Sequence, residues 1–143
     1  MPEHDWFVWA LLSAVFAALT AVFAKVGLGG IDSDYATLIR TVVILFVLAV
    51  FVFVAGKWRD PRTLNAKAVG FLVLSGLATG ASWVCYFRAL KIGDAAKVAP
   101  VDKLSVVLVA IFAAVFLHER PSMGGWFGIG LIAAGVVILS WFR

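Results

Sequence analysis

Five long apolar segments follow one another along the chain, separated by short polar connections. Each is 14 to 22 residues long and contains no charged residue. About 20 helical residues cross the roughly 30 Å of hydrocarbon in a bilayer, at 1.5 Å per residue. Uninterrupted apolar runs of this length lack the alternation of barrel strands. The pattern therefore predicts an all-α integral membrane protein with five transmembrane helices, over residues 6–26, 36–56, 68–88, 98–117 and 123–142.

The connections carry the residues that commonly end and begin helices. Gly29 and Gly30 follow the first segment, and Asp32, Ser33 and Asp34 are three candidate caps for the second helix. Five of the six tryptophans fall near segment ends, where an aromatic belt would place them. We expect one membrane domain over residues 1–143.

Composition excludes a soluble enzyme or regulator. The chain is 64% hydrophobic and only 14% charged, whereas soluble domains have roughly 45–50% apolar and about 25% charged residues. No HExxH, GxSxG, P-loop or dinucleotide-binding motif is present, and neither His4 nor His118 has a metal partner at ligand spacing. The sequence predicts no enzyme activity, metal or cofactor. The net charge of +4 is better explained by anionic lipid headgroups of the bilayer than by nucleic acid.

The basic residues are divided almost evenly between the two membrane faces. Five spans put the termini on opposite sides. The N-terminal side then holds five basic residues, and the C-terminal side holds five, or seven if Arg40 and Lys103 are counted. Orientation follows the Lys/Arg imbalance between short loops, which is nearly absent here. Two interpretations stay open: insertion in one orientation, decided by local charges, or dual topology with antiparallel pairing.

The fourth segment places a carboxylate inside the predicted membrane region. Its 14 uncharged residues are preceded by Asp102 and Lys103, which fall about 6 Å inside the hydrocarbon if the span ends at Leu117. Lys103 can extend back to water, but Asp102 cannot. Pro100 is expected to kink or unwind the helix there. Asp102 is either a solute-binding or coupling residue, or an ion-pair partner of Arg40, Lys25 or Lys103.

Two further sets of residues are candidates for the solute path. Arg40 and Lys25 lie at segment ends on the C-terminal side of the membrane, as Asp102 does. A vestibule shared by these residues would attract anionic or zwitterionic solutes. Arg40 could equally extend to the membrane interface. Hydroxyl groups spaced along one face of the third helix, with aromatic neighbours, suit either a binding wall or interhelical hydrogen bonds. These residues are Ser75, Thr79, Ser82, Trp83 and Tyr86.

Small residues form one face of the fifth segment. Gly124, Gly128 and Gly135 recur at helical spacing and permit close approach of another helix. That partner belongs either to the same protomer or to a second copy.

Several short motifs occur in a fixed order along the chain. They are residues 17–25, Thr37–Thr41, Trp83–Leu90 (WVCYFRAL), Gly93–Asp94, Val98–Ser105 (VAPVDKLS) and His118–Pro121 (HERP). In their order and spacing these motifs resemble the EamA domain of the drug/metabolite transporter superfamily. The resemblance covers essentially the whole chain.

The resemblance implies a five-helix half of a ten-helix transporter. Typical members contain two such domains in inverted orientation and export small metabolites, so a second copy is expected to supply the missing half. Glu119 matches the acidic residue of the family's turn motif, with an expected helix-connecting role. We therefore predict export of a small solute by a homodimer with alternating access in the plasma (inner) membrane. A small dual-topology passive channel and a non-transporting partner subunit are the alternatives.

Overall fold

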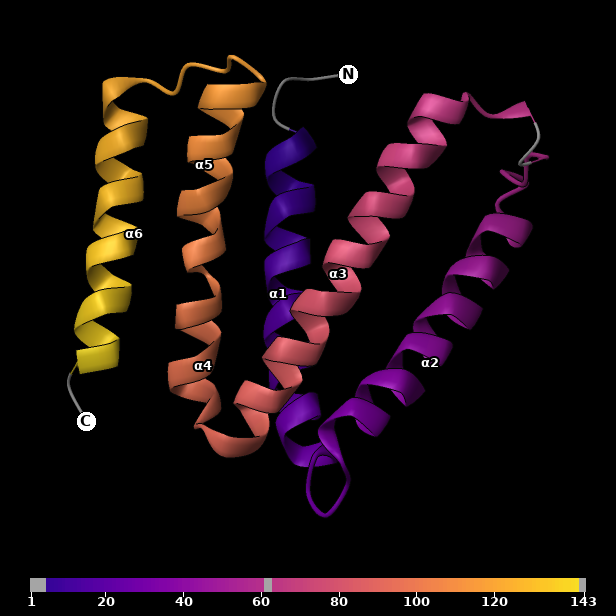
Figure 1. Cartoon of the computed structure of the whole chain (residues 1–143), viewed down its shortest axis with the longest axis horizontal. Coiled ribbons are helices and arrows are strands. Elements are labelled where there is room, and N and C mark those ends of the chain that lie inside the picture. Colours follow the sequence, from indigo (N-terminus) through magenta and orange to yellow (C-terminus); the bar gives the residue numbers. More distant parts are fainter. Residues whose placement is uncertain (1–4, 61–62, 142–143) are drawn as a thin grey trace. The chain divides into compact units, whose positions relative to one another are not determined.

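The computed structural model describes residues 5–60 and 63–141, which are helical apart from short connections. Among these described residues, five stretches are long and apolar enough to cross a membrane, and α4 and α5 together make the fourth. The predicted all-α class with five membrane-spanning stretches is confirmed. The last residue of the predicted fifth span, residue 142, lies outside the described residues. The helices (Figure 1) are α1 (Asp5–Gly27), α2 (Ser33–Val54), α3 (Ala66–Ile92), α4 (Ala95–Asp102), α5 (Leu104–Phe116) and α6 (Met123–Trp141).

Asp32 fixes the start of α2. Its carboxylate accepts hydrogen bonds from the backbone N–H groups of Asp34 and Tyr35, at 2.9 and 3.1 Å. The first N–H groups of a helix have no partner within the helix, so such a cap stabilises its first turn. Of the three candidate caps, Asp32 is therefore the one used, and α2 begins three residues before the predicted span.

The fourth span is interrupted next to Asp102, as Pro100 predicted. Proline has no N–H group and cannot continue the hydrogen-bond ladder of a helix. Lys103, between α4 and α5, donates its N–H to the Pro100 carbonyl and accepts from the N–H of Val106, both at 3.0 Å. Both bonds span three residues rather than four, which tightens the backbone locally.

The chain divides into two compact units. In the first, residues 1–21 and 92–143, α4 and α5 pack against α6. In the second, residues 22–91, the end of α1 is followed by α2 and by α3, which runs back antiparallel to α2 (Figure 1).

Most large apolar side chains of the described residues are exposed. The buried hydrophobic residues of the described part of the chain are Ala21, Leu28, Phe87, Leu90 and Val136. A soluble protein rarely exposes contiguous apolar patches beyond a few hundred Å². Lipid is the solvent that such a surface requires, because apolar side chains contacting acyl chains leave no hydrocarbon–water interface.

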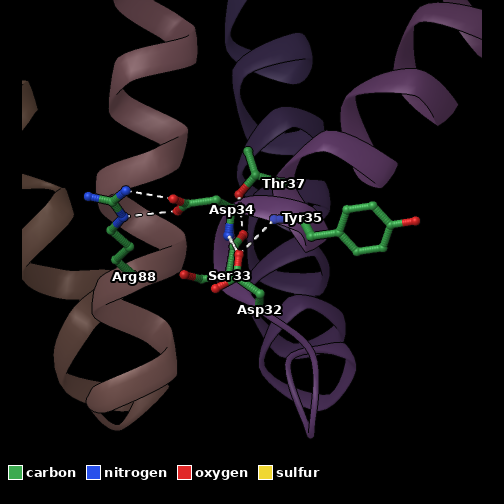
Figure 2. A network of polar contacts seen from close by, with 6 residues as sticks. All are labelled: Asp32, Ser33, Asp34, Tyr35, Thr37 and Arg88. Atoms are coloured by element: carbon green, nitrogen blue, oxygen red, sulfur yellow. Dashed lines mark hydrogen bonds and ion pairs between the residues drawn. The ribbon is translucent and has the colours of Figure 1, made fainter.

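An ion pair joins α2 to α3 within the second unit (Figure 2). The Asp34 carboxylate in the first turn of α2 accepts hydrogen bonds from Nε and Nη2 of Arg88 on α3, at 2.9 and 2.6 Å. Tyr35, the next residue along, points away from Arg88 (Figure 2). Two parallel bonds fix orientation as well as distance, so the pair sets how the start of α2 meets the end of α3.

We expect a charge swap to identify this pair as a structural link. Asp34→Arg and Arg88→Asp should each lower the melting temperature of the purified protein in detergent, because each brings like charges together. The double variant should recover most of the loss; recovery is incomplete because a carboxylate also favours a helix N-terminus. Combining Arg88→Asp with Glu119→Arg, at an exposed turn, is the control and should recover nothing. If the double variant lost as much melting temperature as the two single variants lose together, the structural link would be contradicted.

Candidate functional site

Arg40 is a cation within the apolar, membrane-spanning stretch of α2. It lies seven residues into α2, about 10 Å along the helix from Ser33. Its guanidinium carbon is 4.5 Å from the ring centroid of Trp83 and 5.2 Å from that of Phe87. The two rings are four residues apart on α3 and so share one face of that helix. Arg40 therefore connects α2 to α3 through aromatic rings, one turn or more beyond the Asp34–Arg88 pair.

The aromatic rings offset part of the cost of placing a charge at this depth. An arginine at the centre of a bilayer costs roughly 3 kcal/mol on insertion scales, and less nearer the interface. A desolvated cation over an aromatic face gains up to about 2 kcal/mol. Phe87 is 2% exposed, but Arg40 itself is only half-buried, so its gain lies below that upper figure. The rings attract the positive charge, but they are poor acceptors for its five N–H donors.

Those donors have no acceptor within the described part of the chain. Neither a hydrogen bond nor an ion pair joins Arg40 to any described residue. On the same stretch of α2, the Thr37 hydroxyl donates to the Ser33 carbonyl and the Thr41 hydroxyl to the Thr37 carbonyl, both at 2.8 Å. Because each hydroxyl uses its proton in this way, its oxygen remains an acceptor. This part of α2 thus presents a cation flanked by two hydroxyl groups.

The other cations at this end of the second unit are held by backbone or carboxylate groups. Lys25 donates to the Leu90 carbonyl at 2.6 Å, and Lys91 donates to the Ile31 carbonyl. Arg88 is taken by Asp34. The predicted vestibule residues Lys25 and Arg40 therefore both lie in the second unit, with different kinds of partner.

Asp102 lies in the first unit, at the end of α4. Its carboxylate is 3.3 Å from the Lys103 amine, and the two side chains are 35% and 55% exposed. Pairing with Lys103 was one of the three partnerships the sequence left open. Because Asp102 is the last residue of α4, its half-buried carboxylate lies directly beside the interrupted backbone. Its role in solute binding stays a prediction.

The hydroxyl residues of α3 differ in exposure and in the contacts they make. Ser75, Thr79 and Ser82 are exposed and Tyr86 is half-buried. Thr79 donates its hydroxyl proton to the Ser75 carbonyl at 2.9 Å, and the Tyr86 ring meets the neighbouring Phe87 ring edge-on, 6.3 Å between centroids. Hydroxyl oxygens thus remain on an open face of α3, as either a binding wall or a helix-packing surface would require.

The small-residue face of α6 is largely open. A Cβ atom placed on Gly128 or Gly135 would meet nothing within 4 Å, and one on Gly124 would meet only the Ser122 hydroxyl, at 3.8 Å. Close packing of another helix on this face stays a prediction.

Sequence reasoning missed the partners of the two arginines. Asp34 was considered only as a cap, and the rings that hold Arg40 lie more than 40 residues away in sequence. Two features of the sequence could have indicated these contacts. Trp83 and Phe87 are aromatic residues four positions apart on one helix, and Arg40 and Arg88 had no assigned acidic partner. Among the described residues, no group of three His, Cys, Asp or Glu side chains could hold a metal ion.

Comparison with known proteins agrees with this architecture. The model of the EamA-like transporter family matches residues 5–141. An uncharacterized transporter in the cobO 3′ region of Sinorhizobium sp. is 61% identical over 140 residues, covering 98% of this chain and 99% of the relative. The uncharacterized transporter YvbV of Bacillus subtilis (strain 168) is 25% identical over 135 residues, 92% of this chain but 43% of that protein. No solved structure matches.

These matches confirm the resemblance drawn from the motifs, and with it a transport role rather than an enzymatic one. Five apolar stretches suited to spanning a bilayer and a family match over nearly the whole chain give the same answer: this multi-pass membrane protein belongs to the EamA-like transporter family.

Proposed function

We propose that two copies of this chain form an antiparallel homodimer that exports a small solute across the plasma (inner) membrane by alternating access. The observation that carries the proposal is the length of the Bacillus relative, of which this chain matches only 43%. The Sinorhizobium relative, in contrast, is matched over 99% of its length. The chain thus corresponds to about one half of a longer transporter, and a second copy is the simplest source of the other half.

The number of spans supports opposite orientations. When a unit with five spans is repeated within one chain, the second unit enters the membrane from the opposite side. Two separate copies reproduce that arrangement only if they insert antiparallel. The nearly equal distribution of lysine and arginine between the two faces supports insertion in both orientations, since the imbalance between short loops sets orientation. Rocking of two inverted halves about a central site is a common mode of alternating access.

Within the dimer, we assign Asp102 as the carboxylate that binds or couples to the solute. Transporter sites commonly lie where a helix is interrupted and its backbone is available to line a cavity, and the interruption at Lys103 adjoins Asp102. Lys25, Arg40 and Lys103 would tune the charge of the site. The wall would come from the α3 face described above: Ser75, Thr79, Ser82, Trp83 and Tyr86.

Reporters fused after Arg143 test the orientation. We expect a reporter active only inside the cell and one active only outside to give comparable signals. Lys57→Gln with Arg59→Gln should shift nearly all molecules to one orientation, and Lys97→Gln with Arg143→Gln to the other, because positive charge is retained on the cytoplasmic side. Each pair of substitutions alone should give little dimer, and co-expression should restore it. Signal from one compartment only in the unaltered protein would contradict the antiparallel dimer.

Replacing the Asp102 carboxylate tests its assigned role. In proteoliposomes, Asp102→Asn should lower counterflow exchange about 10- to 100-fold, the range expected for one lost hydrogen bond to a charged group. The solute is the one selected by a thermal-shift screen of candidate metabolites. Glu119→Gln, at an exposed turn, should leave exchange unchanged, and both variants should elute as dimers. Unchanged exchange by folded Asp102→Asn would exclude a binding or coupling role.

A further inference from the structure

We propose that Arg40, held against Trp83 and Phe87, is the receptor for an oxyanion group on the transported solute. The inference rests on the proposed transport function, because it names the class of solute that the site takes. The chemistry is that of a carboxylate or a phosphate monoester attached to a planar, largely apolar skeleton. The geometry that carries it lies entirely within the second unit.

Arg40 has unused hydrogen-bond donors. A guanidinium group presents five N–H donors in a rigid fork that matches the two oxygens of a carboxylate or phosphate. Trp83 and Phe87 lie 4.5 and 5.2 Å from its central carbon and fix its position. No described residue accepts its hydrogen bonds. A positioned guanidinium with open donors is suited to bind an oxyanion.

The nearest acid on α2, Asp34, is already paired with another cation. Asp34 lies six residues before Arg40, about 9 Å along the helix, and both of its oxygens accept from Arg88, at 2.9 and 2.6 Å. This pair holds the carboxylate toward α3 (Figure 2). It therefore leaves the positive charge of Arg40 available to an incoming anion.

Positive charge exceeds negative charge around Arg40. The cations near the meeting point of α1, α2 and α3 outnumber the carboxylates there, Asp32 and Asp34. They are Lys25, Lys91, Arg88 and, about 10 Å into α2, Arg40. The contacts of Lys25 with Leu90, of Lys91 with Ile31 and of Arg88 with Asp34 bring three of these cations to that junction. A surplus of positive charge beside apolar walls raises the local concentration of anions.

Aromatic rings near Arg40 suit the uncharged part of such a solute. The rings of Trp83 and Tyr86 on α3 are half-buried, whereas the Phe87 ring is 2% exposed and closed to a solute. Aromatic rings favour edge-to-face and offset contacts with further aromatic groups. A solute with a planar skeleton would thus gain contacts beyond those of its charged group, and a small inorganic anion would not.

Thermal unfolding of the purified dimer in detergent tests the proposal, with benzoate, phenylphosphate and the neutral isostere benzamide as probes at equal ionic strength. Benzoate or phenylphosphate should raise the melting temperature in a concentration-dependent way, because a ligand that binds only the folded state stabilises it. Benzamide should not. A stronger effect of benzoate identifies a carboxylate solute, and a stronger effect of phenylphosphate identifies a phosphate monoester.

Substitutions assign the effect to Arg40. Arg40→Gln should abolish the anion-dependent rise, and Arg40→Lys, which keeps the charge but not the fork, should raise the required concentration about tenfold. Arg120→Gln, at an exposed turn, should respond like the unaltered protein. If Arg40→Gln does not fold, Arg40→Lys decides the outcome.

The proposal is overturned by three results: no response to either anion, an equal response to benzamide, or an unchanged response in Arg40→Lys. Because the assay measures binding in detergent rather than orientation or flux, such a failure leaves the antiparallel dimer to be judged by the reporter fusions. A single orientation in the reporter test would likewise leave an anion response of Arg40 intact.

Discussion

Hydrocarbon solvates neither a charge nor an unpaired backbone group, and the arrangement of this protein depends on that property of the bilayer. The backbone therefore forms helices, and the large apolar side chains face outward into lipid. Each charged side chain near the membrane interior needs a partner from the protein. Lys25 and Lys91 use backbone carbonyls, Arg88 uses Asp34, and Arg40 uses two aromatic rings. The polar contacts that join α1, α2 and α3 are thus concentrated where one end of each helix meets the others.

The helices were predictable from sequence because each membrane span carries its own signal. Segment length and apolarity located them, and Pro100 located the interruption that ends α4. The contacts between helices were not predictable in the same way. Asp34 and Arg88 are separated by 54 positions, and several acids and bases near segment ends were equally plausible partners. Local spacing explains why Thr79 donates to the Ser75 carbonyl, but it says nothing about which ring meets Arg40.

A half-transporter explains several features that a complete five-helix transporter would not require. The hydroxyl face of α3 is exposed, and Gly128 and Gly135 of α6 are open to close approach. An odd number of spans, a balanced distribution of lysine and arginine, and a longer Bacillus relative matched over 43% of its length all agree with a second copy in the opposite orientation. In that view the chain keeps its charges balanced because both orientations are needed for one functional dimer.

Distances between spin labels on the two copies test this central claim most directly. Ala66 and Ile92 are the first and last residues of α3, about 39 Å apart along the helix axis. In an antiparallel dimer, a label at residue 66 of one copy lies on the same membrane face as residue 92 of the other. We expect the intermolecular 66-to-92 distance to be shorter than the 66-to-66 and 92-to-92 distances. A 66-to-92 distance longer than both of these would show a parallel dimer and contradict the antiparallel arrangement.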